Sequence, residues 1–366
     1  MKRFTYLFSL TLTLFALAAV VFIGCEGPAG ATGAAGTAGA DGIDGTDGVD
    51  ANATCTECHN NETTVLAMQI EASVSGHMTG GHQRYGDRTE CSTCHTHEGF
   101  LDILASGAYV ASEEYADATP PNCRTCHMIH DTYTDDDFAI RVTEPVTLWF
   151  SGVAVDLGTS NMCVGCHQPR LGDLDPLPVL GGANLVIDDD GWGYPHQSQS
   201  SIVYGTGGYE IAGTENYATA GTSGHAGAGC VGCHMVEPGY GTRAGGHTTL
   251  MGYEGRSGGM TDWTNSCETS GCHSSVDDFD YLNIQTDVAD LWDSLEVILH
   301  KPSVSGDSIM IDGDLNASSG SPLTLTADEA GAYLNLMMVD REKSTGVHNP
   351  GYIKALLKNS IQAMSN

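Results

Sequence analysis

The chain has 366 residues, of which 46 are Asp or Glu and 14 are Lys or Arg, giving a formal net charge of −32 at pH 7. Such an excess of negative charge argues against a nucleic acid as partner and against direct adhesion to anionic lipid, and it suits cationic partners or metal ions. Glycine is common, with 47 residues, and charged residues make up only 16% of the chain. This composition predicts many loops and a small side-chain core.

The first residues have the features of an export signal. Lys2 and Arg3 precede a mostly apolar run from Leu7 to Ile23, which is too short and wrongly flanked for a membrane span. The run ends at Cys25 in a sequence that resembles a bacterial lipoprotein cleavage site. We therefore predict a signal peptide over residues 1–24 and lipidation of Cys25. The alternative is an ordinary cleaved signal that leaves a free thiol.

Residues 25–51 form a predicted tether after the lipidated cysteine. Glycine recurs at every third position from Gly27 to Gly48, which is the collagen period, but Pro28 is the only proline in this stretch. A short trimer-forming collagen segment is one interpretation, and a low-complexity spacer is the other. A flexible coil of this length would reach roughly 25–30 Å and an extended one about 75 Å. We favour the spacer, followed by a single domain over residues 52–366.

Six motifs with two cysteines and a following histidine dominate that domain. Five are regular Cys-x-x-Cys-His: Cys55, Cys58, His59; Cys91, Cys94, His95; Cys123, Cys126, His127; Cys163, Cys166, His167; and Cys230, Cys233, His234. The sixth has four residues between its thiols: Cys267, Cys272, His273. Cys-x-x-Cys-His is the attachment motif of a c-type haem, in which both thiols bond to the porphyrin and the histidine ligates iron. The motifs use twelve of the 13 cysteines and predict six covalent haems.

Other uses of these cysteines explain the pattern less well. Disulfide bonds give no reason for a histidine after every second cysteine. Zinc sites pair two Cys-x-x-Cys knuckles or add distant histidines. Thioredoxin-type motifs need a strand-to-helix context, which is not evident here. For the sixth motif, a disulfide or an unmodified pair stays open as an alternative.

Secondary structure is predicted in few places after the tether. Residues 141–157 alternate apolar and polar side chains and could form a hairpin around Pro145 and Gly152. Helices are expected over residues 286–299, from a capping box at Thr326 to about Val339, and from Asn349-Pro350 to the end, with a buried stripe that includes Leu356. The expected fold is a multihaem cytochrome c, mostly irregular loops and short helices wrapped around six haems, with helices concentrated at the C-terminus. The haems would serve as the core.

The second axial ligand of each iron must come from the remaining histidines. Six of the 15 histidines belong to the motifs, which leaves nine for six places. The favoured distal ligands are His77, His97, His130, His196, His225, His247 and His348, so at least one of these seven is wrong. His82 and His300 are less favoured, because His82 lies close behind His77 and His300 ends a predicted helix. An iron with two imidazoles is saturated and suited to electron transfer, whereas an open position would allow ligand chemistry.

Several motifs carry a family resemblance. The stretches Cys91–Phe100, Cys123–His130, Cys230–Met235 and Gly346–Tyr352 resemble exported multihaem c-type cytochromes of metal-reducing bacteria. The sequence Val347-His348-Asn349-Pro350 is also similar to the multihaem nitrite-reductase and octahaem families, in which such a histidine is a distal ligand. Those reductases carry a special haem with Lys or an open site, and this sequence has no Cys-x-x-Cys-Lys. The resemblance implies haem attachment outside the cytoplasm.

The sequence predicts an electron carrier with no catalytic residue. We expect a lipoprotein that is anchored at the outer membrane and faces the cell surface. It would pass electrons through bis-histidine haems to an extracellular acceptor. Its partners would be redox proteins and extracellular metal acceptors. Two alternatives stay open: a reductase of nitrogen or sulfur oxyanions with one open haem, and the subunit of a polymeric filament. Calcium binding in the acidic runs 135–137 and 188–190 is disfavoured, because neither matches an EF-hand.

Overall fold

A computed structural model of the chain describes residues 64–170, 174–236, 243–255, 258–268 and 272–365. The predicted signal peptide, Cys25 and the tether lie outside the described residues. So does the first attachment motif, Cys55, Cys58 and His59. The described chain is mostly loops joined by short helices and small sheets, which agrees with the general form expected from the sequence.

Short helices occupy the first part of the described chain, and each described motif lies on or beside one. The α-helices are α3 (Thr64–Ala72), α4 (Gly76–Thr79), α5 (Thr89–His95), α6 (His97–Ser106), α7 (Cys123–Cys126), α8 (Asn161–Val164), α9 (Gln199–Tyr204), α10 (Gly224–Ala228) and α11 (Val231–His234). The 3-10 helices are η1 (His82–Tyr85), η2 (Asp135–Phe138), η3 (Gly158–Ser160), η5 (Gly246–Thr248), η6 (Thr264–Ser266) and η8 (Tyr281–Asn283).

The strands of the described residues pair into small antiparallel sheets of two strands each. These are β1 (Val146–Thr147) with β2 (Ala154–Val155), β3 (Leu185–Ile187) with β8 (Leu323–Leu325), β4 (Gly252–Glu254) with β5 (Met260–Asp262), and β6 (Met310–Ile311) with β7 (Asp314–Leu315). The first pair confirms the predicted hairpin, with Val146 opposite Val155. The β3–β8 pair joins segments far apart in the sequence.

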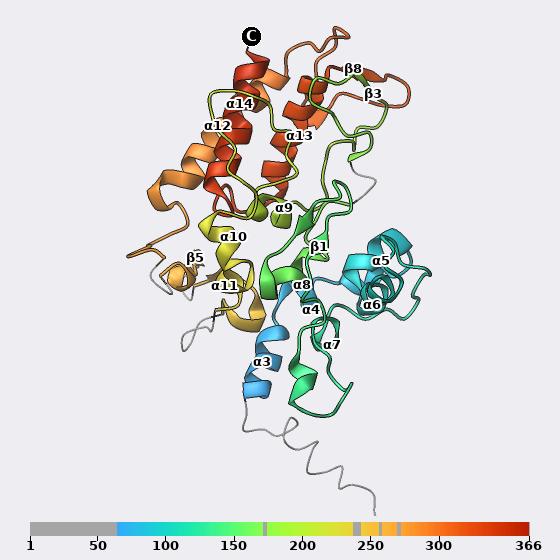
Figure 1. Cartoon of the computed structure of the whole chain (residues 1–366), viewed down its shortest axis with the longest axis vertical. Helices are drawn as coiled ribbons and strands as arrows, with labels where there is room; N and C mark the ends of the chain where they lie inside the picture. The colour runs from blue at the N-terminus through green and yellow to red at the C-terminus, as the bar shows by residue number, and fades with distance from the viewer. Residues whose placement is uncertain (1–63, 171–173, 237–242, 256–257, 269–271, 366) are drawn as a thin grey trace, which may run out of the picture. The chain divides into compact units, whose positions relative to one another are not determined.

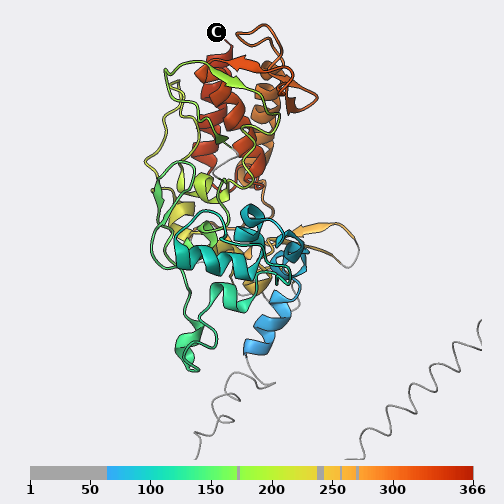
Figure 2. The same ribbon diagram turned by 90° about the vertical axis from the view of Figure 1, so that its right-hand side faces the viewer.

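Three longer helices close the chain, as the sequence predicted. They are α12 (Ile284–Leu299), α13 (Ala327–Arg341) and α14 (Pro350–Met364), and they lie side by side in Figures 1 and 2. The Thr326 side chain caps α13 in a capping box with Glu329, and Asn349 caps α14 with Pro350 in its first turn. Both start signals are confirmed because caps depend on residues within one turn of each other.

An apolar side-chain core surrounds these helices, and here the expectation of a small core was wrong. Helix α13 is buried on almost every side, with Leu336 and Met338 completely inaccessible, and Leu356 of α14 is likewise buried. Gly331 allows close packing in α13, because a Cβ there would lie 1.9 Å from the ring of Tyr209. The whole-chain glycine content misled the prediction, since much of the glycine lies in the tether and the loops before residue 260.

Asn335 of α13 holds a loop against this core by hydrogen bonds, and removing its side chain should destabilise the fold. Its side chain is fully buried, accepts a hydrogen bond from the Tyr209 backbone N–H (2.7 Å), and donates to the Tyr209 carbonyl (2.8 Å) and to Ser360 Oγ (3.0 Å). Asn335→Ala leaves the buried Tyr209 N–H without its hydrogen-bond partner, while the Tyr209 carbonyl keeps its bond from the Ile211 N–H (2.9 Å). We expect this change to lower the free energy of unfolding by about 2–3 kcal/mol. Denaturant titration followed by far-ultraviolet circular dichroism measures this loss. Ser360→Ala is the matched control and should cost about 1 kcal/mol; equal losses in both variants would contradict the assignment.

Candidate functional site

The described attachment motifs share one backbone closure. In three of them the histidine N–H donates to the carbonyl of the first cysteine: His127 to Cys123 (2.9 Å), His167 to Cys163 (3.0 Å) and His234 to Cys230 (2.8 Å). Cys91, Cys94 and His95 lie together in helix α5. One helical turn therefore links the motif ends, and residues three or four apart on a turn project from the same face. Both thiols and the imidazole are thus gathered on one side of the chain.

The expanded sixth motif reaches the same closure. His273 N–H donates to the Cys267 carbonyl at 3.1 Å, although two more residues separate them than in the regular motifs. Residues 269–271, between the two thiols, lie outside the described residues. The first cysteine and the histidine are nevertheless placed as in the regular motifs.

Five histidines of the attachment motifs each face a second histidine. The pairs, with the distance between ring centroids, are His167 and His77 (6.0 Å), His95 and His196 (5.9 Å), His127 and His247 (6.2 Å), His273 and His225 (6.1 Å), and His234 and His348 (6.3 Å). The second member of every pair is one of the seven favoured distal ligands. The structure thus brings five of those seven to a motif histidine from a remote part of the chain.

The spacing of these pairs fits two imidazoles on opposite sides of one metal. A metal–nitrogen bond of about 2 Å on each side, with about 1 Å from each nitrogen to its ring centre, places two centroids about 6 Å apart. Rings in direct hydrogen-bond contact lie closer, as His82 and His95 do at 5.0 Å. The five pairs therefore leave room for an iron between them. The donor set of two neutral imidazoles with adjacent thiols suits a covalently attached haem.

The second nitrogen of many of these rings is already engaged. Nδ1 contacts are His95 to His82 Nδ1 (2.8 Å), His127 to the Phe138 carbonyl (2.7 Å), His234 to the Thr249 carbonyl (2.9 Å), His225 to the Val347 carbonyl (2.6 Å) and His348 to Glu342 Oε2 (2.6 Å). An imidazole that donates from Nδ1 to an oxygen has its lone pair on Nε2, the atom left for a metal. These contacts fix the tautomer that a haem iron requires.

Burial keeps several of these imidazoles neutral. Burial, followed by the charges of neighbouring histidines, lowers the pKa of His95 and of His167 to about 4. Burial also lowers the pKa of His234 and of His247. A neutral imidazole is the form that binds metal, so at pH 7 these side chains need lose no proton before ligation.

The other candidate histidines have different surroundings. His97 is buried and its Nδ1 lies 3.0 Å from Thr125 Oγ1, while His130 has a positive φ of 70° and stacks on Tyr133. Both stay predicted distal ligands. His300 is exposed at the end of α12. His82 contacts His95 from the Nδ1 side and its own Nε2 meets the Gly76 carbonyl at 2.9 Å. Neither contact of His82 could be predicted from the sequence.

Short segments join one histidine pair to the next. His196 pairs with His95, and four residues later Ser200 bonds through N–H (3.0 Å) and Oγ to the carbonyl of His167. A second link runs through His82. Its Nε2 meets the carbonyl of Gly76, the residue before His77, and its Nδ1 contacts His95. The pairs of His95 and His167 are therefore joined twice.

The pair of His234 and His348 is linked to two other pairs. His247, of the His127 pair, lies two residues before Thr249, whose carbonyl meets His234. The Val347 carbonyl, next to His348, meets His225 of another pair. These contacts join the pairs of His127 and His273 to the pair of His234.

Thiol contacts extend the same network. The Cys163 and Cys230 side chains lie close enough for each to shift the pKa of the other, and the Cys94 side chain raises the pKa of Cys166. The first contact joins the motifs of His167 and His234, and the second joins the motifs of His95 and His167.

Two features are absent from the described residues. Within those residues, no cluster of three or more His, Cys, Asp or Glu is arranged to hold a metal ion. Within the same residues, no helix is both long enough and apolar enough to cross a membrane.

Comparison with known proteins adds little. No family model matches the chain, and no curated protein does. One solved structure, described as the outer cell wall cytochrome OcwA, is similar with a TM-score of 0.46 and 19% sequence identity, covering 81% of this chain and 50% of that one. The chain thus spans about half the length of that protein.

Proposed function

We propose that this chain is a c-type cytochrome with six covalent haems that carries electrons through bis-histidine irons. The observation that supports it best is the set of five histidine pairs, each of which joins an attachment motif to a remote imidazole about 6 Å away. For the first motif, His97 and His130 are the candidate partners of His59. When bound, a haem supplies one-electron redox chemistry.

The residues of the chain would hold each haem and keep other chemistry out. The two thiols of a motif would hold the porphyrin covalently, and the two imidazoles of a pair would both ligate its iron, which would leave no position for a small ligand. Carbonyl and side-chain acceptors on Nδ1 orient the rings. The links between pairs hold neighbouring sites at fixed separations, which transfer of electrons between them requires.

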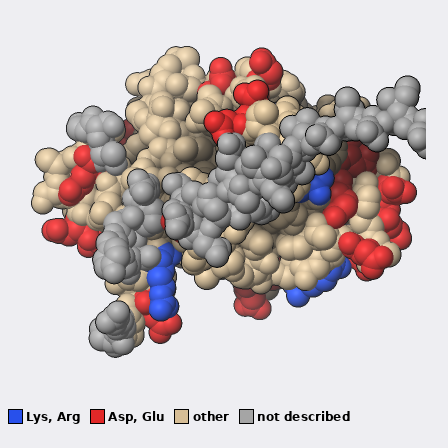
Figure 3. Space-filling model, turned by 90° about the horizontal axis from the view of Figure 1, so that it is seen from below, with Lys and Arg blue, Asp and Glu red and all other residues tan. Residues whose placement is uncertain are grey.

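We further propose export, lipid anchoring through Cys25 and display at the outer membrane on the tether. The strong negative charge supports a cationic partner or a metal acceptor rather than an anionic substrate. On the face seen in Figure 3, Asp and Glu side chains form several groups while Lys and Arg side chains are few. The same charge weighs against the reduction of oxyanions.

Carbon monoxide tests this proposal, because it binds ferrous haem only where an axial position is open. The fully reduced protein, with its haem content measured, should show no change in its absorption spectrum when carbon monoxide is added. Binding at about one haem in six would overturn the bis-histidine assignment and favour a reductase. Electron microscopy of the same sample without detergent separates the carrier from the filament.

A further inference from the structure

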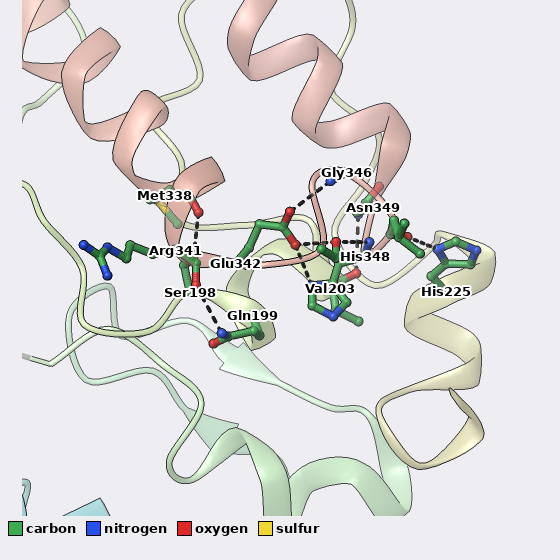
Figure 4. A network of polar contacts seen from close by, with 12 residues as sticks. Ser198, Gln199, Val203, His225, Met338, Arg341, Glu342, Gly346, His348 and Asn349 are labelled. Carbon is green, nitrogen blue, oxygen red and sulfur yellow. Dashed lines mark hydrogen bonds and ion pairs between the residues drawn. The ribbon is translucent and has the colours of Figure 1, made fainter. Parts of the chain in front are cut away.

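Glu342 is the described carboxylate that is both inaccessible to solvent and in contact with a paired histidine. It follows helix α13 as its C-cap and is 0% exposed. A helix C-terminus disfavours negative charge, and so does burial, so a carboxylate here needs strong compensation. Figure 4 shows where the compensation comes from: the chain turns back after α13 and brings Gly346 and His348 onto the carboxylate.

Three donors hold this carboxylate. Oε2 accepts from His348 Nδ1 at 2.6 Å and from Ser344 Oγ at 2.5 Å, and Oε1 accepts from the Gly346 N–H at 2.9 Å. Ser344 Oγ in turn accepts from the His348 N–H at 2.9 Å. Burial by itself raises the pKa of Glu342, but the bonds from His348, Ser344 and Gly346 outweigh it and the pKa is lowered. Its two oxygens face donors only, an arrangement that suits an ionised carboxylate.

The other printed Nδ1 contacts of the paired histidines are to carbonyls or to another imidazole. His127, His225 and His234 donate to backbone carbonyls. Glu71 is the nearest comparable carboxylate: its Oε2 accepts from the His247 backbone N–H at 2.9 Å but lies 3.9 Å from His247 Nδ1, beyond hydrogen-bond distance. The Glu71 and His247 side chains are 23% and 29% exposed. Solvent would screen the charge of Glu71, whereas Glu342 is inaccessible to solvent.

We propose that Glu342 makes the iron between His234 and His348 the lowest in reduction potential of the five described sites, an inference that rests on the proposed function. A carboxylate that accepts from Nδ1 draws the proton toward itself and makes the imidazole a stronger donor at Nε2. A stronger donor and a buried negative charge both stabilise ferric over ferrous iron, so the potential falls. Glu342 is a positioning residue, since it acts through His348.

The test is a spectroelectrochemical titration of the full-length holoprotein and of Glu342→Gln. Gln is nearly isosteric and keeps an acceptor for His348 but removes the charge. We expect one of the two most negative components, about one sixth of the absorbance change, to move to higher potential while the others stay in place. Glu71→Gln is the matched control and should leave the titration unchanged. Titrations of Glu342→Gln and wild type that coincide would overturn the proposal, and so would equal shifts in both variants.

A second measurement needs no variant, in case Glu342→Gln does not fold. The angle between the two ring planes is 35° in the pair of His234 and His348. It is 69–75° in the pairs that contain His77, His196 and His225. Near-perpendicular planes leave two iron orbitals almost degenerate and give electron paramagnetic resonance signals with a very large principal g value. At least one of the last two haems reduced in wild type should lack such a signal, and its presence in both would overturn the proposal. Carbon monoxide binding or a missing haem would instead defeat the proposed function.

Discussion

The variant His77→Ala should convert one iron in six into a site that binds carbon monoxide. His77 faces His167 with ring centroids 6.0 Å apart, so its removal leaves the fourth attachment motif with one axial imidazole. Wild type should bind none, which makes this an all-or-none gain. The fold should survive, because His77 is exposed and lies in the four-residue helix α4, which Ser75 caps. The reduced variant is titrated with carbon monoxide, and the spectral change is expressed per haem.

The matched control is His300→Ala. His300 is also an exposed histidine, at the end of α12, and it is not among the predicted ligands. It should remain inert to carbon monoxide. Binding by both variants, or by neither, would contradict the assignment of His77 to the haem of His167.

Local features of this fold were predictable and long-range ones were not. The start of α13 at Thr326 and of α14 at Asn349 follows from capping within one turn, and both agree with the structure. The pairing of His77 with His167 spans ninety positions of the sequence and depends on how the intervening loops pack. Counting ligands could name the distal candidates, but it could not assign one to each motif.

The supporting residues of the candidate site had no sequence signature at all. Glu342 lies six positions before His348 in a loop, and a carboxylate at that spacing is ordinarily a solvated side chain. The sequence disfavours His82 as a distal ligand because it lies close to His77. In the structure, His82 contacts both the Gly76 carbonyl and His95. The core was misjudged for a different reason, because an average over the whole chain concealed helices such as α13 that are apolar on nearly every face.

The sixth motif carries the other large expected effect. Cys267→Ala combined with Cys272→Ala should lower the number of covalent haems from six to five, because these thiols are the proposed attachment points. The case for equivalence with the regular motifs is structural: His273 closes on the Cys267 carbonyl at 3.1 Å and faces His225 at 6.1 Å. Intact mass spectrometry of the denatured protein, which keeps only covalent haem, counts the haems directly.

The control for this count is the regular fifth motif. Cys230→Ala combined with Cys233→Ala should also lose one haem, and the two double variants should have masses that differ from wild type by one haem each. If wild type already carries five haems, the longer spacing does not support attachment, and Cys267 and Cys272 must have another use, with a disulfide the first to test by thiol alkylation. In that case His225 and His273 would face each other without a covalent haem between them, and the network would lose the branch that Val347 joins to His348. Six haems in wild type and five in each double variant would place the expanded motif on the same footing as the regular ones, since the backbone closure rather than the number of intervening residues decides whether both thiols reach the porphyrin.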